Sequence, residues 1–187
     1  MKRVVILASG SGSLAQAIID EAEIGNQIVA VLSDNADALV LERARKSDIP
    51  TYVIEMKKDR KVWDGEIFDC IKDLKPNLVV SAGFMRILSP EFVETFPTIN
   101  SHPALLPLFP GAHAVRDALS AKATETGTTI HWVDRGIDTG KVIAQARVSI
   151  FPGDDEASLH ERIKEIERGL IVAAIKEVLP TLESRHG

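Results

Sequence analysis

Short, unbroken runs of aliphatic residues recur along the chain and alternate with segments whose apolar residues return every three or four positions. The runs are typical of strands buried on both faces of a parallel sheet, and the periodic segments are typical of amphipathic helices. Strands are therefore expected at 4–8, 28–32, 51–54, 78–82, 99–101, 128–133 and 142–148, the last two as a hairpin. Helices are expected at 14–22, 37–46, 60–74, after Ser89-Pro90, at 114–121 and at 155–178.

The same periodicity predicts how individual helices begin and which residues they bury. Ser13 is a suitable cap for the first helix because its hydroxyl can accept a hydrogen bond from the first turn. In the second helix the spacing places Leu39, Leu41 and Ala44 toward the core. In the last helix one broad apolar face is expected to carry Leu159, Ile163, Ile166, Leu170, Ala173 and Val178.

Three strand–helix units precede residue 76, which predicts an open, doubly wound α/β sheet with helices on both faces. The chain has 187 residues, enough for one domain with a substantial core, and no linker or internal repeat divides it. We therefore expect a single Rossmann-like domain over residues 1–187, built on a mostly parallel twisted sheet.

Composition narrows the class of protein further. The net charge is −5 and no long basic run occurs, so a nucleic-acid partner is not expected. Cys70 is the only cysteine, which leaves no intramolecular disulfide and no cysteine-based zinc site. No stretch reaches the ~20 apolar residues of a membrane span, and the apolar run at 4–8 lacks a signal-peptide cleavage pattern. These features predict a cytoplasmic protein without a membrane partner.

A glycine-rich turn, Gly10-Ser11-Gly12-Ser13, joins the first strand to the first helix. Backbone N–H groups and the helix dipole favour an anion at such a turn, so a phosphate site is expected. With Ala15 the turn also reads G-x-G-x-x-A, and Asp34 follows Gly10 by 24 positions, as in a dinucleotide-binding fingerprint. A simple connecting turn, a mononucleotide-like phosphate and a dinucleotide all fit this pattern.

The segment from Gly83 to Leu88 follows the fourth strand, at the edge of the sheet where ligands of this fold class bind. Its apolar side chains can form a wall, and Arg86 can bind a carboxylate through two parallel hydrogen bonds. A core-packing turn with one surface arginine fits the segment equally well.

Asn100, His102 and Asp138 supply the groups needed to move an acyl carbon onto an amine. An amide can donate to a carbonyl oxygen, an imidazole can exchange a proton near neutral pH, and a carboxylate can hold that imidazole charged. Asn100 and His102 are two positions apart, so in a strand both side chains point the same way. A structural Asn–His pair is the alternative. His131 lies in an alternating strand and could stand at the edge of such a site.

Three motifs together, at 82–88, 100–107 and 136–140, resemble the folate-dependent formyltransferase family over about residues 3–179. The 36 positions between His102 and Asp138 fit the separation in that family. The resemblance implies a formyltransferase fold with a phosphate-binding half to about residue 97 and a catalytic half at about 98–180. It also implies an enzyme of purine biosynthesis that moves a formyl group from 10-formyltetrahydrofolate to the glycyl amine of N1-(5-phosphoribosyl)glycinamide.

The resemblance further implies a role for each matching residue, and it implies no metal. Catalysis is assigned to Asn100, His102 and Asp138. Folate binding is assigned to Arg60, Met85, Arg86, Ile87, Leu88, Asp134, Arg135, Gly136 and Ile137. Contacts with the phosphate and ribose are assigned to Gly10, Ser11, Gly12, Ser13, Leu14, Lys164 and Glu167. Leu14 stands where many relatives carry asparagine, so only its backbone N–H is expected to reach the phosphate.

Other functions remain open on the sequence. Within the family, a formyltetrahydrofolate deformylase would deliver the formyl group to water, and a sugar formyltransferase would deliver it to a sugar amine. The deformylases carry an additional N-terminal domain, which is not expected before the strand at residue 4. From a different class, an NAD(P)-dependent oxidoreductase would use the glycine turn with Asp34. A monomer or a weak homodimer is expected.

Overall fold

The computed structural model describes residues 1–183, so the last four positions of the expected domain lie outside the described residues. Seven strands form one sheet in the order β3-β2-β1-β4-β5-β6-β7. The pairs from β3 to β5 are parallel, and β6 and β7 are antiparallel. The strands are β1 (Val4–Leu7), β2 (Ile28–Ser33), β3 (Thr51–Val53), β4 (Leu78–Ser81), β5 (Thr98–His102), β6 (Glu125–Trp132) and β7 (Val142–Ser149). The expected open and mostly parallel sheet is confirmed.

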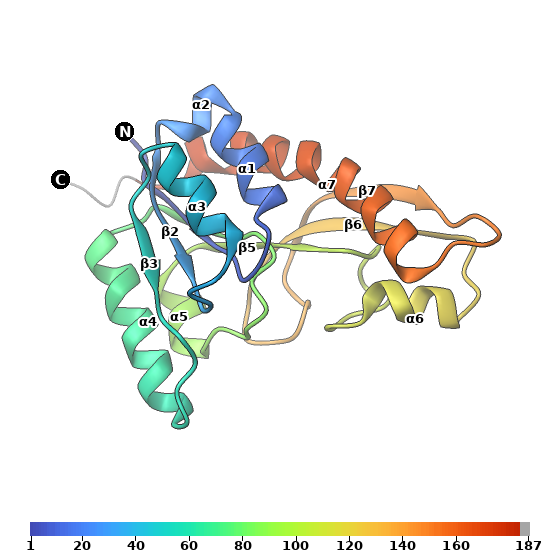
Figure 1. Cartoon of the computed structure of the whole chain (residues 1–187), viewed down its shortest axis with the longest axis horizontal. Coiled ribbons are helices and arrows are strands. Elements are labelled where there is room, and N and C mark those ends of the chain that lie inside the picture. The colour runs from blue at the N-terminus through green and yellow to red at the C-terminus, as the bar shows by residue number, and fades with distance from the viewer. Residues whose placement is uncertain (184–187) are drawn as a thin grey trace.

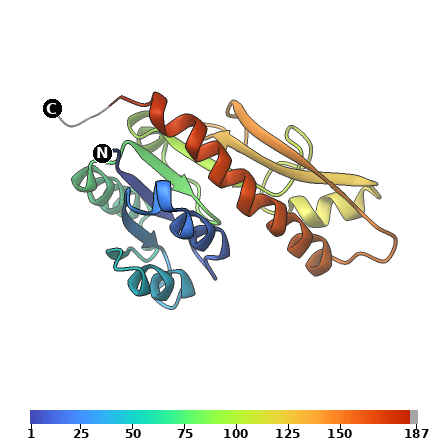
Figure 2. The ribbon, with the colours of Figure 1, turned by 90° about the horizontal axis from the view of Figure 1, so that it is seen from above.

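Helices cover both faces of this sheet, as expected (Figure 1). One face packs against α1, α3 and α7, and the other packs against α4 and α5. In Figure 2, α7 runs obliquely across its face of the sheet. The helices are α1 (Ser13–Asp20), α2 (Ala22–Gly25), α3 (Leu39–Lys46), α4 (Arg60–Leu74), α5 (Pro90–Thr95), α6 (Ala114–Ser120), α7 (Glu156–Val178) and the 3₁₀ helix η1 (Leu179–Thr181).

β1 illustrates why its aliphatic run forms a central strand. Val4 and Ile6 belong to the core on the α1 and α7 face, whereas Val5 and Leu7 belong to the core on the α4 face. Successive side chains of a strand point to opposite faces, so a strand covered on both sides needs an apolar residue at every position. Trp63 of α4 is fully buried in the second core.

Side-chain caps define where several helices begin. Asp59 accepts a hydrogen bond from the Lys61 N–H at the start of α4, and Ser89 caps α5 ahead of Pro90. At α7, Asp155 and Ser158 form a reciprocal capping box. These caps place the helix starts at or within one residue of the sequence-based expectation.

Two expectations for the first half are wrong. The cap of α1 is Gly12 in the left-handed region (φ 72°), and no side chain caps this helix; Ser13 is its first residue. In α3 the Leu39 side chain is 54% exposed, and Val40 takes the buried position instead. Gly12 takes the cap position that was expected for Ser13. Val40 is buried because α3 packs directly on Gly12, where a Cβ would lie 2.6 Å from Val40.

The two ends of α7 bury the expected side chains, but between residues 166 and 174 the buried face is rotated by one residue from the expected one. Ile166 is 38% exposed and Ala173 is exposed, whereas Glu167, Ile171 and Ala174 are buried. Neighbouring helix positions differ by about 100°, so a spacing of three or four fits two adjacent faces. The chosen face also brings a carboxylate to the sheet, which apolar periodicity does not anticipate.

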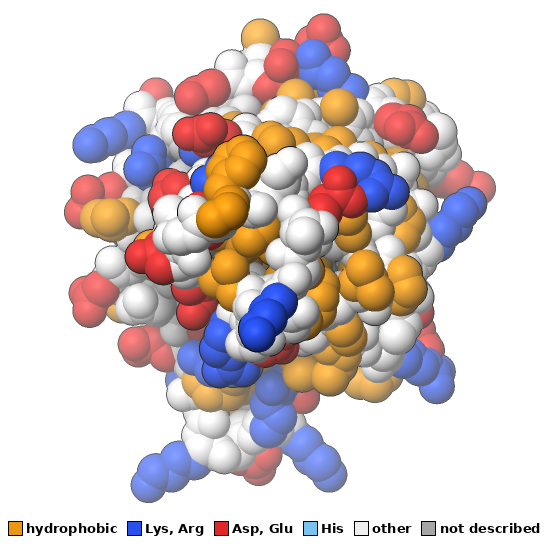
Figure 3. Space-filling view, turned by 90° about the vertical axis from the view of Figure 1, so that its right-hand side faces the viewer, with side chains coloured by type: hydrophobic (Ala, Val, Ile, Leu, Met, Phe, Trp, Pro, Cys, Tyr) orange, Lys and Arg blue, Asp and Glu red, His pale blue; other side chains and the backbone are white. Residues whose placement is uncertain are grey.

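A small third core lies at the far end of the molecule, where Val115 of α6 and Val148 of β7 pack against Leu159 and Ile163 of α7. From that end, hydrophobic side chains occupy the middle of the surface and charged side chains surround them (Figure 3).

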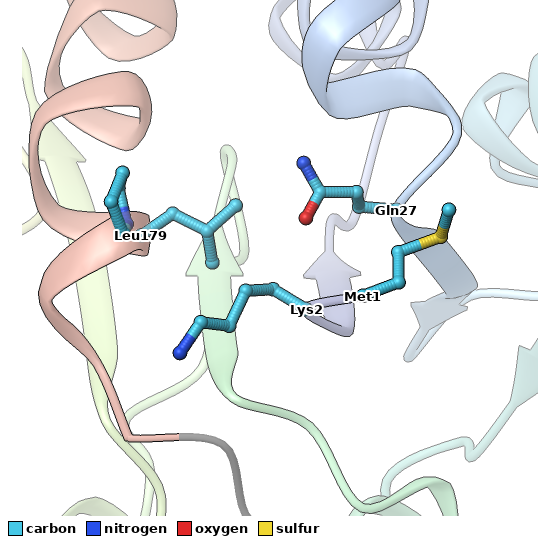
Figure 4. A pocket seen from close by; sticks show the side chains of 5 residues that line it. Met1, Lys2, Gln27 and Leu179 are labelled. Carbon is cyan, nitrogen blue, oxygen red and sulfur yellow. The ribbon is translucent and has the colours of Figure 1, made fainter.

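A hollow of about 370 Å³ lies beside the amino ends of β1 and β2 and is lined by Met1, Lys2, Gln27, Leu179 and Pro180 (Figure 4). The hollow therefore lies at the amino ends of the parallel strands, whereas Asn100 and His102 lie toward the carboxyl end of β5. No helix within residues 1–183 combines the length and apolar character needed to cross a membrane.

Candidate active site

The antiparallel pairing of β5 with β6 builds the centre of the site. Asn100 lies directly opposite His131, and His102 lies directly opposite Thr129. Directly opposed residues share a face of the sheet, so Asn100, His102 and His131 lie on the same side. The prediction that Asn100 and His102 point the same way is confirmed.

Both ring nitrogens of His102 face oxygen acceptors. Nδ1 lies 3.4 Å from Asp138 Oδ2, and Nε2 lies 2.8 Å from the backbone oxygen of Phe109. The ring is buried, with 4% of the residue exposed. The ring therefore lies between a carboxylate and a carbonyl oxygen, each of which can accept from a ring N–H.

Asp138 reaches His102 from the loop between β6 and β7. Its backbone is in the left-handed region (φ 54°), and its Oδ2 accepts a 2.8 Å hydrogen bond from the Gly111 N–H. Burial alone would raise the pKa of this carboxyl, but hydrogen bonds from His131 and Gly111 and the nearby imidazoles lower the pKa overall. Asp138 therefore stays ionised, as its expected role requires. Gly140 permits this approach, since a Cβ there would lie 1.7 Å from the Trp132 oxygen.

His131 is a central member of the cluster that sequence reasoning placed only at its edge. Its Nε2 lies 3.3 Å from Asn100 Nδ2 and 3.5 Å from Asp138 Oδ1, and the residue is 2% exposed. Its Nδ1 lies 2.9 Å from the Trp132 backbone oxygen, which fixes the orientation of the ring. The sequence signal for this role is strand register, because pairing β6 with β5 places His131 opposite Asn100.

The glycine turn before α1 is held from one side by α3. The Val40 N–H donates to the Gly10 oxygen at 3.2 Å, and Arg43 Nε donates to the Ser11 oxygen at 2.8 Å. These carbonyls are engaged by α3, while the first N–H groups of α1 have no intrahelical partner. Leu14 is buried, so its side chain belongs to the core and only its N–H can serve the turn. Arg43 is a support that the sequence pattern did not reveal.

The segment 83–88, which we call the ledge, projects apolar side chains at the carboxyl end of the sheet. Met85 and Ile87 are 71% and 62% exposed, and Gly83 starts the ledge with φ 77°. Arg86 Nε donates to Asp34 Oδ2 at 2.6 Å, so this part of its guanidinium is already engaged. Leu88 differs from Met85 and Ile87 because it packs against the second core.

Arg60 is attached to the ledge rather than extended into solvent. Its Nη2 donates to the Ile87 oxygen, its Nε pairs with Asp64 at 2.8 Å, and its guanidinium lies 4.8 Å from the Trp63 ring centre. The structure thus brings Arg60 to the expected folate-lining segment, although no tight sequence motif surrounds it.

The loop that carries Asp138 is organised by Asp134. Its Oδ1 accepts hydrogen bonds from the Gly136 N–H at 3.0 Å and from Thr139 Oγ1 at 2.7 Å. Arg135 is exposed and pairs with Glu94, while Ile137 is 56% exposed. Ile137 is thus one more exposed apolar side chain of the site region, held by an ordered turn.

Lys164 and Glu167 have different environments on α7. Glu167 is buried and accepts a hydrogen bond from Ser101 Oγ, whereas Lys164 pairs with Glu161 at 2.8 Å. Burial raises the pKa of Glu167, although the Ser101 hydrogen bond and the charges of Lys164 and Arg168 act in the opposite direction. A solvated surface pair is therefore excluded, and a carboxylate lies directly behind the strand that carries Asn100 and His102.

The cluster has a defined chemical capacity. Asn100 can donate an N–H, His102 can hold and exchange a proton, and Asp138 provides a fixed negative charge. Such preorganised donors can stabilise an oxyanion that develops during acyl transfer. Within residues 1–183, no group of three or more His, Cys, Asp or Glu side chains is arranged to hold a metal ion.

Comparison with known proteins shows which class this site and fold define. A family model described as formyl transferase matches residues 2–175, so the chain belongs to the formyl transferase family. The chain is 46% identical over 180 residues to phosphoribosylglycinamide formyltransferase of Mycobacterium tuberculosis, covering 92% of this chain and 83% of the relative. It is 42% identical over 174 residues to the Escherichia coli protein of the same name, with 89% and 82% covered.

Solved structures agree with this assignment. Glycinamide ribonucleotide transformylase 1 from Symbiobacterium toebii superimposes with a TM-score of 0.92 at 34% identity, covering 99% of this chain and 92% of that chain. Phosphoribosylglycinamide formyltransferase from Streptococcus pneumoniae gives a TM-score of 0.88 at 36% identity, with 95% and 99% covered. The dinucleotide alternative loses its main support, because Asp34 is buried and its Oδ2 is paired with Arg86.

Proposed function

We propose that this protein transfers the formyl group of 10-formyltetrahydrofolate to the glycyl amine of N1-(5-phosphoribosyl)glycinamide, a reaction of purine biosynthesis. The observation that carries the proposal is the convergence of Asn100, His102 and Asp138 from β5 and a separate loop. Its support is the similarity to enzymes named for this reaction. The fold alone would not specify the substrates.

Asn100 and His102 stabilise the transition state in this proposal. When the amine attacks the formyl carbon, negative charge develops on the formyl oxygen, and both side chains donate hydrogen bonds to it. Preorganised donors of this kind are typically worth about 3 kcal/mol each. For His102 to reach that oxygen, its Nε2–H exchanges the Phe109 carbonyl for the substrate.

Asp138 keeps the imidazolium in place and charged, because its ionised carboxylate lies beside Nδ1. His131 orients the Asn100 amide through the contact at 3.3 Å. The amine attacks the formyl carbon directly and the bond from that carbon to the folate nitrogen then breaks, so no covalent acyl-enzyme forms. A water molecule carries the proton from the attacking amine to the departing folate nitrogen.

The substrates are assigned to two sides of this centre. The N–H groups of Gly10, Ser11, Gly12, Ser13 and Leu14 bind the phosphate, and Lys164 and Glu167 contact the sugar side of the same substrate. Folate contacts come from Arg60, Met85, Arg86, Ile87, Leu88, Asp134, Arg135, Gly136 and Ile137. In this arrangement residues 1–97 form the phosphate-binding half, 98–180 form the catalytic half, and α7 brings part of the second half back to α1.

The cellular setting belongs to the same proposal. The proposed enzyme acts on two small molecules and works in the cytoplasm as a monomer or weak homodimer. It needs neither a nucleic acid nor a membrane partner.

An absorbance assay with 10-formyltetrahydrofolate tests the proposal. Tetrahydrofolate should form only when N1-(5-phosphoribosyl)glycinamide is present, with a rate that saturates in both reactants. Release without the amine would make water the acceptor and would identify a deformylase. Release only with an amino sugar would identify a sugar formyltransferase.

A further inference from the structure

Asp34 directly follows β2 at the carboxyl edge of the sheet, and the proposed chemistry gives it no role. The residue is 7% exposed, and its Oδ2 accepts the 2.6 Å hydrogen bond from Arg86 Nε. Its Oδ1 is buried without a hydrogen-bond partner among the described residues. A buried carboxylate with one unpartnered oxygen is unfavourable for folding unless an ion pair compensates it. The pair with Arg86 is therefore the feature to explain.

The ion pair joins two strands that are not neighbours. β1 lies between β2, which ends before Asp34, and β4, which precedes the ledge carrying Arg86. The Arg86 side chain is 40% exposed and that of Asp34 is 3% exposed, so the buried carboxylate fixes the inner part of a half-exposed cation. Among the described residues, the two Nη groups of Arg86 have no hydrogen-bond partner. They stay available for an external oxygen acceptor.

Two further attachments hold the ledge. Ser9 Oγ accepts a 2.8 Å hydrogen bond from the Met85 N–H, and the Ser9 N–H donates to the Gly83 oxygen at 3.1 Å. Arg60 of α4 donates to the Ile87 oxygen. The backbone of the ledge is thus attached to the turn after β1 and to α4, whereas its Arg86 side chain is attached only to Asp34. Asp34 is the contact that determines where the guanidinium lies.

We propose that Asp34 is a positioning residue for the folate cosubstrate: it holds the Arg86 guanidinium of the ledge in the geometry that binds folate. This inference rests on the proposed function. Asp34 acts through Arg86 and does not touch the reacting atoms. A charge-assisted hydrogen bond is about twice as strong as a neutral one, which explains why a carboxylate serves better here than an amide.

The variant Asp34→Asn keeps the shape of the side chain and removes its charge. We expect the KM for 10-formyltetrahydrofolate to rise about 5- to 10-fold, the effect of weakening one charge-assisted hydrogen bond. The KM for the amine substrate and kcat should stay within about 2-fold, because Asn100, His102 and the glycine turn are untouched. Asp37→Asn is the matched control, since Asp37 is exposed in the same turn. It should leave all three constants unchanged.

A double variant tests whether Asp34 acts through Arg86 or supports the fold in general. Arg86→Gln alone leaves the buried Asp34 charge without compensation and can fail to fold. The folate KM of Asp34→Asn/Arg86→Gln is therefore compared with the folate KM of each single variant that folds. If Asp34 acts through Arg86, adding Asp34→Asn to an Arg86→Gln protein that folds does not raise the folate KM further. If only the double variant folds, its folate KM should be at least that of Asp34→Asn.

Calorimetric titration with tetrahydrofolate, the expected product, distinguishes a failure of the inference about Asp34 from a failure of the proposed function. Wild type that binds tetrahydrofolate, with about 5- to 10-fold weaker binding in Asp34→Asn, supports the inference. Equal binding by wild type and Asp34→Asn overturns it while leaving the proposed function intact. A wild type that neither binds tetrahydrofolate nor transfers formyl groups overturns the proposed function itself.

Discussion

The His102 ring lies between the Asp138 carboxylate at one ring nitrogen and the Phe109 backbone oxygen at the other. His102→Ala removes the donor that faces the developing oxyanion, so kcat should fall about 10²- to 10³-fold. Calorimetry should show unchanged affinity for the phosphoribosyl substrate, because the proposed phosphate contacts of the glycine turn are unchanged.

His160→Ala is a suitable control, because His160 lies on α7 and makes none of the proposed contacts. Near-normal turnover of His102→Ala would contradict the assignment of this residue to catalysis.

Glu167 couples stability to pH because its pKa is raised in the folded protein, chiefly by burial. The folded state then holds the carboxyl proton to higher pH than the unfolded chain, so ionisation destabilises the fold as pH rises above about 4. Glu167→Gln cannot ionise. Its Tm should match that of wild type near pH 4 and exceed it at pH 7 to 8, while the KM for the amine substrate rises about 10-fold.

Thermal unfolding across this pH range, together with steady-state kinetics, tests the prediction. Glu165→Gln on the exposed side of α7 should change neither quantity. A lower Tm for Glu167→Gln at pH 7 would contradict it.

Asn100 and His102 could be predicted from residue type and from their spacing within a strand, whereas Asp138 was assigned from its motif at 136–140, which resembles that of the family. His131 and the burial of Glu167 could not be predicted with the same certainty. The position of His131 depends on which residue of β6 lies opposite Asn100, and that of Glu167 depends on the rotation of α7. Both are set by packing between distant segments.

At the scale of elements, the turn before α1 depends on Gly12. A side chain there would need a left-handed backbone (φ 72°) and would meet Val40 at 2.6 Å. Gly12→Ala should lower the free energy of unfolding by about 1–3 kcal/mol through backbone strain. It should also raise the KM for the phosphoribosyl substrate more than the KM for folate, because the N–H groups of the turn move.

Urea unfolding and steady-state kinetics measure the two effects. Gly169→Ala is the control, since Gly169 lies within α7 and a Cβ there has open space. Equal stability and kinetics for Gly12→Ala and wild type would show that the turn tolerates a side chain.

Hydrophobic periodicity predicted nearly all of these elements, including the full extent of α4. It did not predict the short α2 or the one-residue rotation of α7. Four residues carry too few apolar repeats to form a pattern, and two adjacent helix faces share the same spacing. Boundaries set by a cap such as Asp155 were predicted better than faces set by tertiary contacts.

At the scale of the whole molecule, residues 1–97 and 98–180, the two halves of the proposal, share one sheet through the pairing of β4 with β5. The chain has two tryptophans, Trp63 in the first half and Trp132 in the second. Trp63→Phe and Trp132→Phe variants each leave one reporter. Within each variant, fluorescence should report the same urea midpoint as far-UV circular dichroism, because the halves unfold as one unit.

The order of strands followed from the sequence only as far as the class of the fold. Alternating strands and helices predicted a parallel sheet, and the expected hairpin of 128–133 with 142–148 is confirmed by the antiparallel pairing of β6 with β7. The antiparallel pairing of β6 with β5 was not predicted, because it depends on contacts between segments distant in the sequence. That pairing brings His131 and the Asp138 loop to Asn100 and His102. The catalytic centre is thus a product of the topology rather than of any single segment.

The fate of the formyl carbon shows whether this protein transfers the formyl group to the glycyl amine and whether His102 takes part. The protein is incubated with 10-formyltetrahydrofolate labelled with ¹³C in the formyl group and with N1-(5-phosphoribosyl)glycinamide, and the products are identified by ¹³C NMR. If the formyl group is transferred as proposed, the label appears as a formamide carbon on the glycyl nitrogen, and His102→Ala abolishes this signal on the same timescale. Label recovered as free formate, or unchanged labelling in His102→Ala, would contradict this proposal.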